Sequence, residues 1–290
     1  MSFTQNIKAQ LARQENGCGF CDIAELSSVV KLCTGYTARE IVISTENEDV
    51  AYRIQYLFER VFSRRIEYIN RNGIFRFYPG ADFFMKEMAP KLMLYNSGKS
   101  NITPRPCCRA AYVRGAFLGG GSVSDPKVRY HMEFDTRHES YANQLCGVLA
   151  KMGIGSKITR RKGRFIVYIK EYEVIADILG TIGAVSAAME LYNISIEKDI
   201  RNTANRQANC EVANIEKTTK TASLQIEAIR KIERHMALSE LPETLSEIAE
   251  VRLKYPEESL KELGERLSPP LGKSGVNHRL KRIMEIAEGL

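Results

Sequence analysis

The chain lacks long apolar runs and any nucleotide-binding signature, and these absences narrow the classes of protein to which it can belong. No apolar stretch approaches the roughly 20 residues that span a bilayer. The opening segment MSFTQNIKAQLARQ has no apolar core of a secretory signal. Neither GxxxxGK[ST] nor a strand-associated GxGxxG occurs. We therefore expect a cytoplasmic protein that has no membrane partner and no nucleotide site.

The excess of basic over acidic residues is small and unevenly distributed. The 290 residues, more than one ordinary compact domain contains, include 42 Lys and Arg against 35 Asp and Glu, a net charge of +7. Residues 1–204 hold 28 basic and 21 acidic side chains, whereas residues 205–290 hold 14 of each. The first part therefore carries the whole excess, which is compatible with a polyanionic partner without requiring one.

Cysteine is present in an odd number, seven, which excludes a complete disulfide framework. Cys18 and Cys21 have the C-x₂-C spacing of a zinc knuckle or a redox pair, but a structural zinc ion needs four ligands. The only other close pair is Cys107-Cys108, and neither His131 nor His138 has a suitable spacing. We therefore expect buried thiols, no metal ligand and no cofactor.

A pattern of apolar residues recurs at an offset of 91 positions. The stripe Ala51, Ile54, Leu57, Phe58 and Val61 has its counterpart in Ala142, Leu145, Val148, Leu149 and Met152. Both stripes have the spacing of an amphipathic helix. Asn72-Gly73 and Lys162-Gly163 each separate two β-rich segments and predict a two-residue hairpin. The pattern therefore predicts two αββαββα units.

The segment AYVRGAFLGGGSVSD predicts a helix with Gly115 and Gly119 on one face. Glycine disfavours helices by up to about 1 kcal/mol relative to alanine, so close approach of a second helix would explain it. CDIAELSSVVKLCTG offers that helix, with small Ser27 and Ser28 and with Gly35 as its C-terminal cap. The alternative is a glycine-rich loop at residues 119–121.

These segments resemble the LAGLIDADG homing endonucleases and, more closely, the WhiA family of bacterial regulators. The resemblance to the WhiA family lies in RGAFLGGGSVSDP at 114–126, YHMEF at 130–134 and NRQANC at 205–210. It implies an α+β fold: a tandem αββαββα LAGLIDADG-like repeat, with halves at 1–100 and 101–200, a linker at 201–221 and an all-α helix-turn-helix domain at 222–290. It also implies a DNA-binding transcription regulator linked to sporulation or to cell division and chromosome segregation.

The sequence lacks the acidic residues with which such nucleases bind their catalytic metal. The positions that correspond to them are Leu118 and Gly120 in the second helix and, in the first, Lys31 and Cys33 or Leu32 and Thr34. None can hold a hard ion such as Mg²⁺, which needs oxygen ligands. Asp125 is the nearest carboxylate, in a turn. We expect no enzyme activity, and the alternative is an active LAGLIDADG-type DNA endonuclease.

The last 69 residues predict consecutive helices and a helix-turn-helix. SLQIEAIRKIERHMAL has an apolar stripe at Leu224, Ile226, Ile229 and Ile232, and KSGVNHRLKRIMEIAEGL has one at Val276, Leu280, Ile283 and Ile286. Lys273 to Arg282 contains no acid. On the opposite face, Ser274, Asn277, His278 and Lys281 could contact base edges, while Arg279 and Arg282 could reach phosphates. The alternative is a helical bundle whose basic face contacts protein.

The second hairpin is rich in basic residues, which could bind phosphates: Arg160, Arg161, Lys162 and Arg164. The alternative, equally supported, is a solvated edge hairpin protected against strand pairing. Double-stranded DNA is the expected partner, and the protein is then nucleoid-associated. Another transcription regulator or RNA polymerase is the partner left open for the nuclease-like domain. Residues 186–221 predict a partly ordered linker, helical through Ile196.

Overall fold

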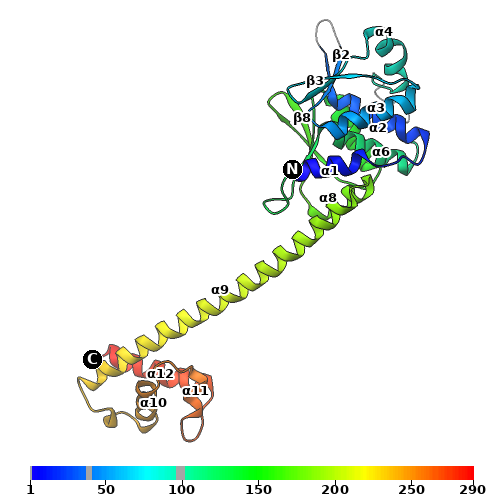
Figure 1. Cartoon of the computed structure of the whole chain (residues 1–290). Coiled ribbons are helices and arrows are strands. Elements are labelled where there is room, and N and C mark those ends of the chain that lie inside the picture. The colour runs from blue at the N-terminus through cyan, green and yellow to red at the C-terminus, as the bar shows by residue number, and fades with distance from the viewer. Residues whose placement is uncertain (1, 37–40, 96–101) are drawn as a thin grey trace. The chain divides into compact units, whose positions relative to one another are not determined.

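The computed structural model describes residues 2–36, 41–95 and 102–290 (Figure 1). The chain forms two compact units, Met1–Lys198 and Asp199–Leu290. Each has its own hydrophobic core. Among the described residues, no helix is both long enough and apolar enough to cross a membrane.

The first unit contains the predicted αββαββα repeat twice. In the first copy α2 (Gly19–Cys33) leads to β1 (Thr34–Tyr36), β2 (Ile41–Thr45), α3 (Glu48–Phe62), β3 (Tyr68–Arg71), β4 (Ile74–Phe77) and the short helical segments α4 (Ala81–Phe83), η1 (Phe84–Met88) and α5 (Ala89–Lys91). In the second copy α6 (Pro106–Gly120) leads to β5 (Gly121–Val123), β6 (Met132–Thr136), α7 (Glu139–Ala150), β7 (Lys157–Arg161), β8 (Arg164–Ile169) and α8 (Tyr172–Ile182). The antiparallel sheets have equivalent orders, β1-β2-β4-β3 and β5-β6-β8-β7.

Both predicted hairpins form, because their turn residues adopt the left-handed backbone conformation. The φ angles are 55° and 76° at Asn72 and Gly73, and 49° and 78° at Lys162 and Gly163. Positive φ at both central residues matches the right-handed twist of the flanking strands. The turns fix the register of β3 on β4 and of β7 on β8. They thereby place the basic side chains of the second hairpin.

Gly115 and Gly119 of α6 lie against the backbone of α2, as their spacing predicted. A Cβ atom at Gly115 would come within 2.2 Å of the Glu25 carbonyl oxygen, and one at Gly119 within 3.0 Å of the Val29 carbonyl oxygen. The helix extends to Gly120, so residues 119–121 are not a loop. Gly35 lies in β1 and does not cap α2, because the chain passes directly from helix to strand.

Helix α1 (Phe3–Ala12) had no counterpart among the predicted elements. Ser2 and Gln5 form a reciprocal capping box at its start, a signal that the sequence S-x-x-Q contains. Ile7 and Leu11 are fully buried in the core of the first unit. The Thr4 hydroxyl accepts from the amide of Val123, at 2.9 Å, and so supports strand β5. The helix therefore belongs to the nuclease-like fold.

The predicted partly ordered linker is instead part of α9 (Val185–Glu233), a continuous helix of 49 residues. Every side chain from 199 to 221 is exposed. The segment has no glycine or proline, so nothing interrupts the helix, and it has no apolar stripe because it packs against nothing within its unit. Leu224, predicted to be buried, is 47% exposed.

The second unit is a small helical domain. The end of α9 is followed by η2 (Leu238–Glu240), α10 (Glu243–Lys254), α11 (Leu260–Glu265) and α12 (Lys273–Glu288). Ile229 and Ile232 of α9 contribute to one apolar cluster with the three later helices. The predicted helices and the helix-turn-helix arrangement are present.

Candidate nucleic-acid interface

The turn between α11 and α12 depends on a close backbone approach. The amide of Leu271 donates to the carbonyl of Gly264 at 2.9 Å. A Cβ atom at Gly264 would lie 1.9 Å from the Leu271 carbonyl oxygen, a distance that no side chain tolerates. Glycine at this position therefore lets the turn fold back onto α11 and sets the direction in which α12 begins.

Helix α12 has a buried face and an open face. Val276, Leu280 and Ile283 are fully buried, as predicted. Ile286, also predicted to be buried, is half-buried, and the neighbouring Ala287 is buried instead. Four polar residues share the other face at the helical spacing of three and four. Of these, Ser274, His278 and Lys281 are exposed and Asn277 is half-buried. The structure thus brings the predicted base-contacting residues together at the N-terminal half of α12.

The two arginines of α12 differ in their freedom to move. Arg279 is 24% exposed and its guanidinium lies 3.7 Å from a carboxylate oxygen of Glu247 on α10. It also donates to the carbonyl of Thr244, at 3.3 Å. Arg282 is 64% exposed and pairs, at 2.8 Å, with Glu285 one turn later. Arg282 can therefore reorient at little cost, whereas Arg279 also holds α12 against α10. Lys273, the first residue of α12, is exposed.

Most of the basic side chains of the β7–β8 hairpin are open to solvent. Arg161 and Lys162 are exposed. Arg161 stands directly opposite Arg164 in the ladder, on the face of the sheet away from the core. Arg164 donates from Nε to a carboxylate oxygen of Asp135 on β6, at 2.5 Å. That ion pair reduces the repulsion between the two arginines and fixes the position of Arg164.

Arg160 lies on the opposite face of the hairpin from Arg161, because side chains alternate along a strand. Its guanidinium carbon stands 5.6 Å from the centroid of the Phe165 ring. Arg160 is nevertheless exposed, since β7 is the edge strand of its sheet. The structure therefore divides the predicted basic cluster between two faces, and Arg161, Lys162 and Arg164 remain as the group on the open side.

At the C-terminal ends of α2 and α6, the residues at the positions that correspond to the nuclease acids carry no carboxylate. Leu118 is fully buried, and a Cβ atom at Gly120 would lie 2.4 Å from the carbonyl oxygen of Asp135. Lys31 and Cys33 are buried and have no carboxylate to contribute. The residues at the predicted metal positions therefore do not fit Mg²⁺.

Lys31 is a buried cation at one of those positions. Its ammonium donates to the side-chain oxygen of Gln144 on α7, at 2.9 Å. It lies 5.7 Å from the ring centroids of both Tyr112 and Tyr141. Burial lowers the pKa of Lys31 to about 8. A cation placed there repels a metal ion, and its contacts join α2 to the second repeat.

A buried charge network at the middle of the helix pair was not predicted. Glu25 of α2 is fully buried and accepts from Nε and Nη2 of Arg53, at 2.7 and 2.9 Å. Arg114 of α6 donates to the same carboxylate at 3.2 Å and to the carbonyl of Ile182 at 2.9 Å. Asn16 donates to Glu25 at 2.8 Å. The network connects α2, α3, α6 and the end of α8. No local pattern marks it, because its members are far apart in sequence.

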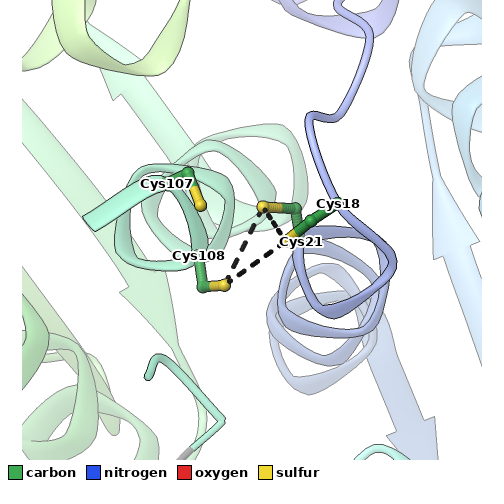
Figure 2. A group of neighbouring side chains, drawn as sticks. All are labelled: Cys18, Cys21, Cys107 and Cys108. Atoms are coloured by element: carbon green, nitrogen blue, oxygen red, sulfur yellow. Dashed lines mark hydrogen bonds between the residues drawn. The ribbon is translucent and has the colours of Figure 1, made fainter. Parts of the chain in front are cut away.

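A group of four thiols was also not predicted to assemble. Cys18, Cys21, Cys107 and Cys108 place their sulfur atoms within 4.8 Å of one another (Figure 2). Of the described residues, this is the only group of three or more Cys, His, Asp or Glu close enough to hold a metal ion. Cys107 is exposed and Cys18 half-buried, so the expectation of buried thiols was wrong for these two.

Hydrogen bonding within the group separates the acidities of its members. A side-chain hydrogen bond from Cys21 lowers the pKa of the Cys18 thiol to about 7. Burial raises the pKa values of Cys21 and Cys108. The lowered pKa favours the thiolate at Cys18, the form that reacts with electrophiles and binds metals.

Comparison with known proteins identifies both parts of the chain. Residues 109–201 match the WhiA LAGLIDADG-like domain, and residues 204–287 match the WhiA C-terminal HTH domain. Proteins described as "Probable cell division protein WhiA" from Clostridium novyi and Clostridium acetobutylicum are 39% and 40% identical to the chain. Each alignment covers 100% of the chain and 98% of the relative.

Solved structures give the same result for the fold. The full-length DUF199/WhiA protein from Thermatoga maritima has a TM-score of 0.63 at 28% identity, over 100% of this chain and 99% of that one. The N-terminal LAGLIDADG domain of DUF199/WhiA has a TM-score of 0.52 at 22% identity, over 63% of this chain. With a LAGLIDADG-like fold, a helix-turn-helix domain and full-length relatives near 40% identity, the chain belongs to the WhiA family.

Proposed function

We propose that the chain is a sequence-specific DNA-binding transcription regulator that acts in cell division or sporulation and resides at the nucleoid. The observation that carries the proposal is the open face of α12, which presents Ser274, Asn277, His278 and Lys281 beside a well-packed turn. The module that reads DNA is residues 222–290. The names of the relatives, "Probable cell division protein WhiA", support the biological role.

The chemistry of this face suits the major groove of duplex DNA. An asparagine amide can both donate to and accept from adenine, and lysine can donate to the acceptors of guanine. No acidic residue interrupts Lys273 to Arg282, so the first part of α12 does not repel phosphates. In a helix-turn-helix the N-terminal residues of the second helix contact base edges. Asn277 is half-buried, whereas the other three are exposed.

The nuclease-like unit, in this proposal, binds without cutting. Its helix ends hold Leu118, Gly120 and Lys31 where a nuclease would need carboxylates, and its second hairpin exposes basic side chains. Without carboxylates at these helix ends, phosphates can approach them without a bridging cation. The unit therefore contributes affinity that depends little on sequence. Docking of a second transcription regulator or RNA polymerase is the other use of the same surface.

A binding titration of the full chain on genomic fragments, at two salt concentrations, tests the proposal. We expect a subset of fragments to bind at least about 10³-fold more tightly than bulk DNA, as specific regulators do. Affinity should fall steeply with salt, because bound cations are released from the phosphates. Equal affinity for all fragments, or no binding at all, would refute the proposal that the chain is a sequence-specific regulator.

Incubation of plasmid DNA with the protein and Mg²⁺ tests the loss of nuclease chemistry separately. We expect the supercoiled plasmid to remain intact at protein concentrations that saturate binding, because the predicted metal positions have no carboxylate ligands. Nicked or linear products that vanish with a chelator would instead favour a LAGLIDADG-type endonuclease. This assay and the titration have independent outcomes.

A further inference from the structure

We propose that Cys18, Cys21, Cys107 and Cys108 form a four-thiolate site for one divalent zinc ion, which fastens α2 to α6. Four cysteines from two distant parts of the chain converge at one place (Figure 2). Cys18 and Cys108 are 90 residues apart in sequence. The group includes none of the residues proposed to contact DNA and none of the predicted nuclease metal positions.

The separations of three of the sulfur atoms are close to those around a single tetrahedral ion, and the fourth, that of Cys107, lies within 4.8 Å of the others. Zinc–sulfur bonds of about 2.3 Å place tetrahedral ligands about 3.8 Å apart. The Sγ atom of Cys18 lies 3.3 Å from that of Cys21 and 3.9 Å from that of Cys108, and Cys21 lies 3.9 Å from Cys108. A disulfide would need about 2.05 Å. An iron–sulfur cluster holds its cysteines around a larger inorganic core than one ion.

The local structure explains how adjacent cysteines can serve one ion. Cys107 and Cys108 follow Pro106 in the first turn of α6, and consecutive helical residues point about 100° apart. They therefore approach the centre from different directions, with Cys18 and Cys21 across from them (Figure 2). Cys18 immediately precedes α2, and its carbonyl accepts from the amide of Cys21 at 2.9 Å.

The surroundings favour bound thiolates and a structural role. Both pairs lie at helix N-termini, whose dipoles stabilise negative charge. Cys21 and Cys108 are buried, while Cys18 is half-buried and Cys107 exposed, so the ion has a path from solvent. Four protein ligands leave no open coordination position for a substrate, as in structural zinc sites. The opposite, C-terminal ends of the same helices hold the predicted nuclease positions.

Metal analysis of the untagged full chain, purified in reductant, tests the proposal. We expect one zinc ion per chain in the wild-type protein and its loss in Cys107→Ser, a substitution at an exposed side chain that should leave the fold intact. Cys210→Ser is the matched control, because Cys210 is also exposed but lies outside the group, and it should retain the ion. Cobalt in place of zinc should give the visible absorption of a tetrahedral tetrathiolate centre.

Thermal melting with and without a chelator provides a second readout. Removal of the ion should lower the Tm of the wild-type chain by about 5 °C or more, since it cross-links two helices. The melting of Cys107→Ser should not respond to the chelator, and that of Cys210→Ser should respond like the wild type. A cooperative melt shows that each variant folds. A wild-type chain that contains no stoichiometric metal and gives no tetrahedral cobalt spectrum, or that holds a Cys18–Cys21 disulfide in reductant, overturns the proposal.

Discussion

Glu25 illustrates how a single residue connects the two repeats. Its carboxylate is fully buried and accepts hydrogen bonds from arginines on two other helices. A buried charge is tolerated only when it is paired and hydrogen-bonded, and here both oxygens are satisfied. The carbonyl oxygen of the same residue lies where a side chain at Gly115 would be. Glu25 therefore takes part both in the buried ion pairs, through its side chain, and in the close packing of α2 on α6, through its backbone.

Glu25→Gln should destabilise the first unit strongly. The amide keeps the shape of the carboxylate but leaves Arg53 and Arg114 buried without a counter-charge. We expect the free energy of unfolding to fall by about 3 kcal/mol or more, as for other broken buried pairs. Chemical denaturation measures it. Glu67→Gln is the control, because the pair of Glu67 with Arg65 is exposed and should contribute less than about 1 kcal/mol. Equal losses in the two variants would contradict a special role for the network.

At the scale of elements, α2 and α6 can pack closely only because glycine, which has no side chain, occupies positions 115 and 119 of α6. Gly115→Ala would place a methyl group 2.2 Å from a backbone carbonyl oxygen, so the helices must separate. We expect a loss of stability of about 1–3 kcal/mol, typical of overpacking. Gly147→Ala in α7 meets nothing within 4 Å and should stabilise by up to about 1 kcal/mol through helix propensity. Thermal melting should therefore show a lower Tm for Gly115→Ala and an equal or higher Tm for Gly147→Ala than for the wild type.

The elements that the sequence predicts well are those whose signal is local. Asn72-Gly73 defines its hairpin alone, and the spacing of Gly115 and Gly119 indicates a packed helix. The cysteine group and the network around Glu25 could not be predicted from local sequence, because the tertiary fold brings together residues that are far apart along the chain. The exposed part of α9 has no periodic signal, since it buries no face. Its lack of glycine and proline was the only local indication of a helix.

The face of α12 makes the proposed recognition testable residue by residue. Asn277→Ala should weaken binding to the preferred site by about 1–3 kcal/mol and relax the preference at one base pair. Arg282→Gln should weaken binding to all sequences alike and reduce the salt slope by about 1, because it removes one phosphate contact. Titrations on preferred and scrambled duplexes separate the two effects. An unchanged site preference in Asn277→Ala would show that α12 is not the recognition helix.

At the scale of the whole molecule, charge and predicted specificity lie in different units. Residues 1–204 carry the entire net charge of +7, whereas residues 205–290 are neutral overall and contain the acid-free start of α12. Net charge raises affinity for any polyanion, while base contacts choose among sequences. This division leads us to expect that the nuclease-like unit tightens binding to all DNA by a similar factor.

Neutralising the exposed hairpin in the full chain tests that division. The triple variant Arg160→Gln, Arg161→Gln, Lys162→Gln leaves Arg164, whose ion pair with Asp135 supports the sheet. If the hairpin contacts phosphates, the slope of log K against log salt should fall by about 2 to 3, since each released counterion contributes about 0.9. The ratio of affinities for preferred and scrambled duplexes should stay constant. Quantitative titration over a range of salt concentrations measures both quantities.

The matched control removes the same charge elsewhere in the first unit. Lys86, Lys127 and Lys151 are exposed and lie outside the hairpin, so replacing all three by glutamine also lowers the net charge by three. If only the overall field of the unit matters, the two triple variants should weaken binding equally, and mostly at low salt. If the hairpin touches DNA, only its variant should change the slope. Should neither variant alter binding, the basic hairpin has no DNA role, and docking of a regulator or polymerase becomes the better account of the exposed charges.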